Sequence, residues 1–176
     1  MGWGAYGKIP ALGDFVRLGL SPGFVTPWDR WLQAGLVGAR QRLGAGFRPR
    51  YDRAPVWRFA LSPGIAGAMG ACGVLMPSVD RVGRAFPLTL AVLAPGTPPD
   101  PAAPRALANA EEVALDALDP AAGREALRAA LDALAPPDGP PAPSGAMFWT
   151  PGRRLHAPAL RPERLLDLLL DPAETA

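Results

Sequence analysis

The chain has 176 residues, of which 20 are glycine and 23 are proline. This share is about twice the usual content of roughly 12% and approaches that of low-complexity chains. A hydrophobic fraction of 49% with five tryptophans nevertheless excludes a disordered chain, because disordered chains lack the apolar surface that offsets their ordering entropy. The net charge of +2 hides a basic first half, in which residues 1–94 carry eleven Lys and Arg against four acids.

The prolines are concentrated in two places. Ten of them crowd the stretches 95–104 and 136–143, and the rest of the chain has ordinary proline usage. We therefore predict one globular domain over residues 1–176, within which residues 95–145 form a variable Ala/Pro-rich helical segment. The basic residues are scattered and accompany no nucleic-acid-binding motif, so we expect no nucleic acid partner.

Turn residues and hydrophobic periodicity predict an α+β fold, a mainly antiparallel sheet flanked by helices. A short strand over residues 3–6 is followed by a loop to about residue 23. Thr26 is the expected N-cap of the first helix, with Pro27 at its first position and Gly44 near its end. The later elements are expected to be strands over 56–61, 73–79 and 86–93, helices over 105–118 and from Asp119-Pro120 to about 135, a strand over 147–150 and a helix that begins at Pro162.

The longest uncharged run, residues 59–79, has the length of a membrane span. It contains the turn signal Ser62-Pro63-Gly64, which favours two strands joined by a turn. The first residues lack the basic and apolar regions of a signal peptide. We therefore expect a cytoplasmic protein without direct membrane insertion. Four tryptophans at helix and strand positions are expected in the core, and Trp3 is expected to be partly exposed; the four are Trp28, Trp31, Trp57 and Trp149.

The sequence contains little that points to catalysis or to a cofactor. A single cysteine, Cys72, excludes an internal disulfide, and neither it nor the single histidine, His156, has motif support for a metal site or a nucleophile. Residues 2–8 match the spacing of a phosphate-binding loop. Ile9, however, stands where Ser or Thr would hold Mg²⁺, and Pro10 has no N–H to offer a phosphate.

Two charged turns remain as candidate functional features. Gly13-Asp14-Phe15 is typical of a turn in which the carboxylate binds nearby N–H groups, and it could also form a polar contact surface. In residues 80–84, Asp80 could organise the turn and pair with one arginine. Alternatively, Arg81 and Arg84 could be exposed as a pair that grips an acidic group on a partner.

Several segments together resemble the TagF family of type VI secretion-associated proteins. The resemblance covers four blocks in order and is specific through residue 94. The blocks are residues 7–17, 27–33, 55–61 and 73–84, continued by Phe86-Pro87-Leu88-Thr89 and by a late strand at Phe148-Trp149-Thr150. The resemblance implies a longin- or profilin-like domain without enzymatic activity or cofactor. It also implies a cytoplasmic bacterial regulator that represses the type VI secretion system after translation, in association with a forkhead-associated scaffold protein and, in some systems, a PP2C-type phosphatase.

The family supplies no site residues, so we predict them from the surface chemistry of the two turns. The predicted partner contacts are their charged members, Lys8, Asp14, Arg17, Asp80, Arg81 and Arg84. Two alternatives of other classes remain at this point. One is a ligand- or nucleotide-binding sensor, supported by the Gly-rich start and the Asp-Arg turn. The other is a GTPase-associated platform, which rests on fold analogy alone.

Overall fold

The computed structural model of the chain describes residues 2–102 and 105–170. It shows one seven-stranded sheet in which every neighbouring pair of strands is antiparallel, in the order β2-β1-β5-β4-β3-β6-β7. The predicted α+β class is thereby confirmed. In chain order the elements are β1 Trp3–Gly7, β2 Val16–Leu18, α1 Pro22–Leu43, the 3-10 turn η1 Gly44–Gly46, α2 Phe47–Tyr51, β3 Trp57–Leu61, β4 Gly70–Met76, β5 Leu88–Ala94, α3 Arg105–Asp116, α4 Arg124–Ala133, β6 Ala146–Thr150, β7 Arg153–Ala157 and α5 Pro162–Leu169.

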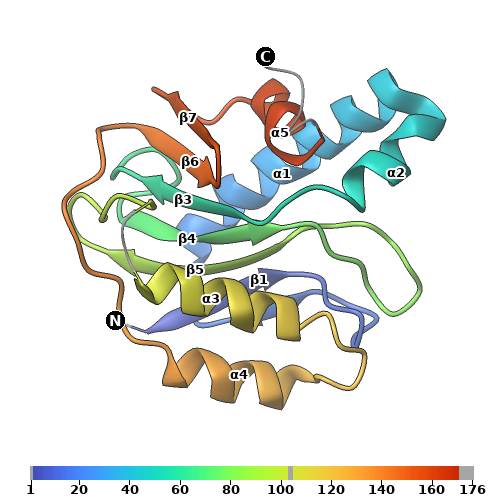
Figure 1. The fold of residues 1–176 in the computed structure, drawn as a ribbon, viewed down its shortest axis with the longest axis horizontal. Helices are drawn as coiled ribbons and strands as arrows, with labels where there is room; N and C mark the ends of the chain where they lie inside the picture. The colour runs from blue at the N-terminus through green and yellow to red at the C-terminus, as the bar shows by residue number, and fades with distance from the viewer. Residues whose placement is uncertain (1, 103–104, 171–176) are drawn as a thin grey trace.

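Helices cover both faces of the sheet (Figure 1). The core on one face includes α1, α2 and α5, and the core on the other includes α3 and α4. Along β4, Leu75 belongs to the first core, while its neighbours Val74 and Met76 belong to the second. Because successive strand residues point to opposite faces, a strand covered on both sides is apolar along most of its length. This explains the uncharged run, which forms β3 and β4 as the turn signal predicted. No helix among the described residues is long and apolar enough to cross a membrane.

The two proline-rich connectors lie beside each other. Pro99 and Pro141 form an isolated antiparallel bridge, flanked by backbone hydrogen bonds from Asp100 to Pro140 (2.8 Å) and from Ala142 to Pro98 (2.9 Å). Proline cannot donate to a ladder, so the donors in this bridge come from the residues between the prolines. The pairing brings together the two ends of the segment that carries α3 and α4.

The predicted start of the first helix is wrong. The helix begins five residues earlier, with Ser21 at the N-cap in an extended conformation and Pro22 at its first position. Ser21-Pro22 and Thr26-Pro27 carry the same start signal, and the earlier pair prevails. Pro27 therefore lies inside α1, where it leaves the carbonyl of Gly23 without its helical donor. Gly23 is exposed, so water can satisfy that carbonyl.

Other boundaries also differ from the sequence predictions. The strands predicted over 73–79 and 86–93 run instead over β4 and β5, and β2, α2 and β7 were not predicted. The helix predicted from Asp119 begins only at Arg124, because the Asp119 carboxylate accepts the N–H of Ala121 (2.8 Å) in a separate turn. The start of the last helix at Pro162 is confirmed.

Three of the four tryptophans expected in the core are buried: Trp28, Trp31 and Trp57. Trp149 is only half-buried, and its ring lies under the guanidinium of Arg58 (4.8 Å to the ring centroid). Trp3, which we expected to be partly exposed, is buried. Its indole N–H donates to the carbonyl of Ala135 (2.8 Å), the residue that follows α4. The long segment after β5 therefore covers the beginning of the chain.

Candidate functional site

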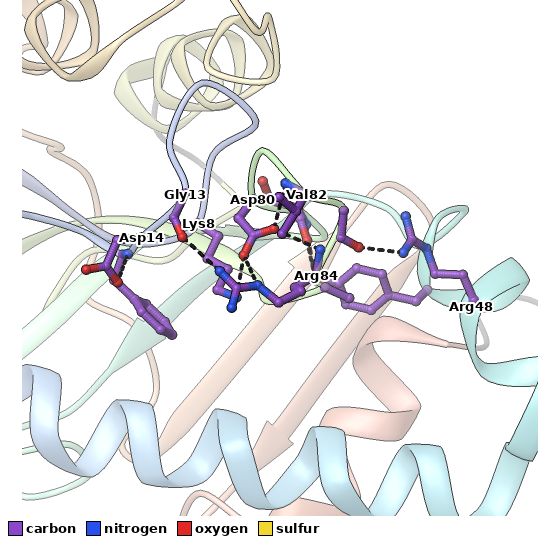
Figure 2. Close-up of polar contacts among 12 residues, drawn as sticks. Lys8, Gly13, Asp14, Arg48, Asp80, Val82 and Arg84 are labelled. Carbon is purple, nitrogen blue, oxygen red and sulfur yellow. Dashed lines mark hydrogen bonds and ion pairs between the residues drawn. The ribbon is translucent and has the colours of Figure 1, made fainter.

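A buried carboxylate organises the turn between β4 and β5. Asp80 is 1% exposed, and one of its oxygens accepts hydrogen bonds from Lys8 Nζ (2.9 Å) and Arg84 Nε (2.6 Å). The other oxygen accepts the backbone N–H groups of Val82 (3.1 Å) and Arg84 (2.9 Å), as Figure 2 shows. Gly83 completes the turn with a φ of 81°, a conformation that favours glycine. Asp80 therefore organises the turn and pairs with one arginine, and it also pairs with a lysine 72 residues away.

The charge state of Asp80 follows from these contacts. Burial opposes ionisation, but the hydrogen bonds from Lys8 and Arg84 and the positive charge of Lys8 outweigh it. They hold the pKa of Asp80 well below its usual range. The carboxylate is thus an ion at neutral pH, and it is paired with cations that come from two different loops.

We expect acid to weaken this turn through protonation of Asp80. Since its pKa is lower in the folded than in the unfolded protein, its contribution to stability is complete above the unfolded pKa of about 3.9. That contribution is lost as the pH falls below about 4 toward the folded pKa. Thermal unfolding followed by circular dichroism should show a steeper fall in Tm between about pH 5 and pH 2 for the wild type than for Asp80→Asn. Equal slopes would contradict the assignment.

The turn is also fixed from outside by three neighbouring segments. The loop after β1, the end of α1 and the short helix α2 each bind its backbone or its arginine. Figure 2 shows the contacts of Gly13 and Arg48. The contacts are Arg84 Nη2 to Gly13 O (2.9 Å), Arg48 Nη1 to Gly83 O (2.8 Å), Arg40 Nη2 to Ala85 O (3.2 Å) and Arg81 N to Leu12 O (2.8 Å). We call residues 80–85 with these contacts the braced turn. These contacts hold the backbone of the turn in one conformation.

The structure places the six predicted contact residues in two groups. Lys8 and Asp80 are buried and bind each other, so they hold the turn in place and are not themselves at the surface. The other four are exposed and sit at the turn or on the adjacent loop and β2; they are Asp14, Arg17, Arg81 and Arg84. The sequence placed all six in two loops, and the Lys8–Asp80 pair joins those loops.

The exposed members differ in what they touch. Asp14 accepts the N–H of Phe15 (2.7 Å), which is the turn chemistry expected of it. Arg17 lies over the rings of Tyr6 (5.8 Å) and Phe15 (6.0 Å), an arrangement in which a guanidinium is attracted to the aromatic face. No carboxylate among the described residues pairs with the guanidinium of Arg81. Arg81 is therefore the arginine of the turn whose guanidinium has no ion pair in the described part of the chain.

Sequence reasoning missed Arg40 and Arg48. They lie in α1 and α2, far from the turn in sequence, and only folding brings their guanidinium groups to its backbone. Pro49 disfavours a helix, so the sequence did not predict α2. The run from Arg48 to Arg53 holds three arginines in six residues, which was the available signal.

The other candidate chemistry is resolved by the fold. Residues 3–7 form β1 between two other strands, so they do not form a loop that could wrap around a phosphate. Cys72 is buried in β4, and burial raises the pKa of its thiol to about 12. His156 lies on β7, with β6 and β3 between it and Cys72, so the two cannot form a catalytic pair. Among the described residues, no group of three or more His, Cys, Asp or Glu could hold a metal ion.

These features define the class of protein. It is an α+β protein with one antiparallel sheet between two helical layers, and it presents a preformed basic turn. The sequence model of the TagF N-terminal domain, described as type VI secretion system-associated, matches residues 4–134. The chain belongs to the TagF family, which links it to type VI secretion.

A solved structure supports the same assignment at the level of the whole fold. The crystal structure of PA0076 from Pseudomonas aeruginosa PAO1, at 2.05 Å resolution, superimposes with a TM-score of 0.87 and 31% sequence identity. The similarity covers 99% of this chain and 96% of that one. It therefore includes α5 and β7, which lie beyond the matched family domain. The comparison with curated protein sequences finds no match.

Proposed function

We propose that the protein is a non-enzymatic cytoplasmic regulator that represses the type VI secretion system after translation by binding one of its protein components. Membership of the TagF family supports the link to secretion. The braced turn is the observation that supports binding through this surface. It offers exposed arginines on a backbone that Asp80, Arg40 and Arg48 already hold in place.

Preorganisation is the physical reason to expect binding at this surface. A loop that must become ordered on binding loses affinity through its ordering entropy, and a braced loop avoids that cost. Arg81 and Arg84 can each present a guanidinium to a carboxylate, and Arg84 keeps 63% of its side chain exposed while it pairs with Asp80. The proposed partner is the forkhead-associated scaffold protein of the secretion system, with a PP2C-type phosphatase as a further partner in some systems.

A secretion assay tests this proposal. In a bacterium with an active type VI secretion system and without its own copy of the gene, we expect overproduced wild-type protein to reduce secretion of the system's exported proteins. Arg81→Glu should restore secretion, because it reverses the charge of Arg81, the turn residue that has no ion pair in the described part of the chain. Arg30→Glu is the matched control, since Arg30 is exposed on α1 away from the turn.

Two results would count against the proposal. Unchanged secretion in the presence of the wild-type protein would contradict repression itself. Full repression by Arg81→Glu would still support a repressor, but it would contradict the proposal that the braced turn contacts the partner.

A further inference from the structure

A groove lies directly beside the braced turn. It has a volume of about 400 Å³ and is bounded by α2, by the residues that follow β4 and by the end of α3. Ligand sites in proteins span roughly 300–1,000 Å³, so the groove can take more than one side chain. Much of its lining is apolar and comes from segments far apart in sequence; it includes Pro10, Val56, Met76, Leu115 and Leu118.

The groove has an unusually exposed apolar rim. Leu115 is 51% exposed, although Leu107, Ala110 and Ala114 on the same helix are fully buried. An apolar partner side chain seated against Leu115 would remove hydrophobic surface from water, which favours binding in proportion to the area covered.

Ser78 provides a polar atom in the same lining. The Tyr51 hydroxyl donates to the carbonyl of Ser78 (2.8 Å) and accepts its N–H (3.0 Å), so the backbone of Ser78 is fully engaged. The Ser78 hydroxyl itself is buried and has no hydrogen-bond partner among the described residues.

The segments around the groove carry more cations than acids. Arg48 belongs to both features, because it lines the groove and donates to Gly83 O in the turn. It is also ion-paired with Asp52, which lines the groove beside it (2.8 Å). The segments that meet here, residues 8–17, 40–53 and 80–85, hold nine Lys and Arg against three Asp. Of the three carboxylates on α3, Glu111 is bound to Arg58, Asp116 lines the cleft between α3 and α4, and Glu112 is exposed.

We propose that the groove and the braced turn together bind one acidic segment of a partner protein that carries an apolar anchor. The carboxylates of the segment meet Arg81 and Arg84, and the apolar side chain enters the groove against Leu115. The inference rests on the proposed function, because the segment belongs to the partner through which the protein acts. It adds a recognition rule: charge directs the segment to the turn, and the groove selects its anchor.

A pair of matched substitutions tests the groove. Leu115 and Val37 are both 51% exposed, but Val37 lies on α1, on the opposite face of the sheet. Binding to the purified forkhead-associated scaffold protein is measured by biolayer interferometry for Leu115→Ser, Leu115→Glu, Val37→Ser and Val37→Glu. We expect Leu115→Ser to weaken binding about tenfold and Leu115→Glu to weaken it further, because it removes the apolar contact and also repels an acidic segment. Both Val37 variants should bind within about twofold of the wild type.

The outcomes separate the groove from the proposed function. The proposed role of the groove would be overturned if Leu115→Glu binds as tightly as the wild type. It would also be overturned if Val37→Glu binds as weakly as Leu115→Glu. If the wild type does not bind the scaffold protein, the same variants are compared in the secretion assay. Repression by the wild type and by Leu115→Glu alike then overturns the groove alone. Loss of repression in Leu115→Glu but not in Val37→Glu supports it, and failure of the wild type to repress overturns the proposed function and the groove together.

Discussion

Asp80→Ala is expected to lower the Tm by roughly 5–10 °C, because it leaves the buried ammonium of Lys8 without its counter-ion. The substitution also leaves two backbone N–H groups of the turn without their acceptor. An uncompensated buried charge costs more than the pair is worth, since the loss includes the desolvation of the remaining ion. The braced turn should therefore lose its shape, and partner binding should fall with it.

A second substitution distinguishes the effect of the unpaired Lys8 charge from the other effects of Asp80→Ala. Lys8→Met keeps most of the side-chain volume and removes the charge, so the double variant no longer holds an unpaired ammonium. We expect the double variant to recover part of the Tm that Asp80→Ala loses, as measured by differential scanning fluorimetry. If the double variant is no more stable than Asp80→Ala, Lys8 and Asp80 are not coupled as described.

Trp28→Ala is expected to destabilise the fold by about 3–5 kcal/mol. Trp28 is 0% exposed, and its ring lies against those of Phe24 (5.5 Å), Trp31 (4.8 Å) and Phe59 (4.9 Å between centroids). Its indole N–H donates to the hydroxyl of Thr89 (2.9 Å), which would be left buried and unpaired. This loss is a large fraction of the roughly 5–15 kcal/mol by which domains are stable.

Denaturant unfolding measures this effect, with Trp149→Ala as the control. Trp149 is only half-buried and stacks on Arg58, so its loss should cost clearly less than that of Trp28. Equal losses for the two variants would show that Trp28 does not hold α1 to the sheet in the way the contacts indicate.

The fold class was predictable because both signals behind it are local. The uncharged run with an internal turn predicted β3 and β4, and proline marked the start of α5. Short elements were not predictable in the same way. β2 has three residues, and β7 alternates half-buried and exposed residues at the edge of the sheet. Their strand structure depends on pairing with β1 and β6, which no local pattern encodes.

The position of the candidate site was predictable from the sequence, but the long-range contacts that hold it were not. Asp80 was expected to organise a turn, since Asp commonly binds N–H groups nearby in sequence. The partners that brace the turn lie much farther along the chain; Lys8 is 72 residues from Asp80, and Arg48 is 35 residues from Gly83. Contacts over such separations depend on the whole sheet order. They convert a charged loop into a rigid basic surface.

The measurement that tests this account most directly is the affinity of the purified protein for the purified forkhead-associated scaffold protein, in low and in high salt, with Arg81→Glu beside the wild type. The account predicts saturable binding that weakens as salt screens the charges and that is at least about tenfold weaker for Arg81→Glu in low salt. Absence of binding by the wild type, or equal affinities of the two proteins at both salt concentrations, would contradict it.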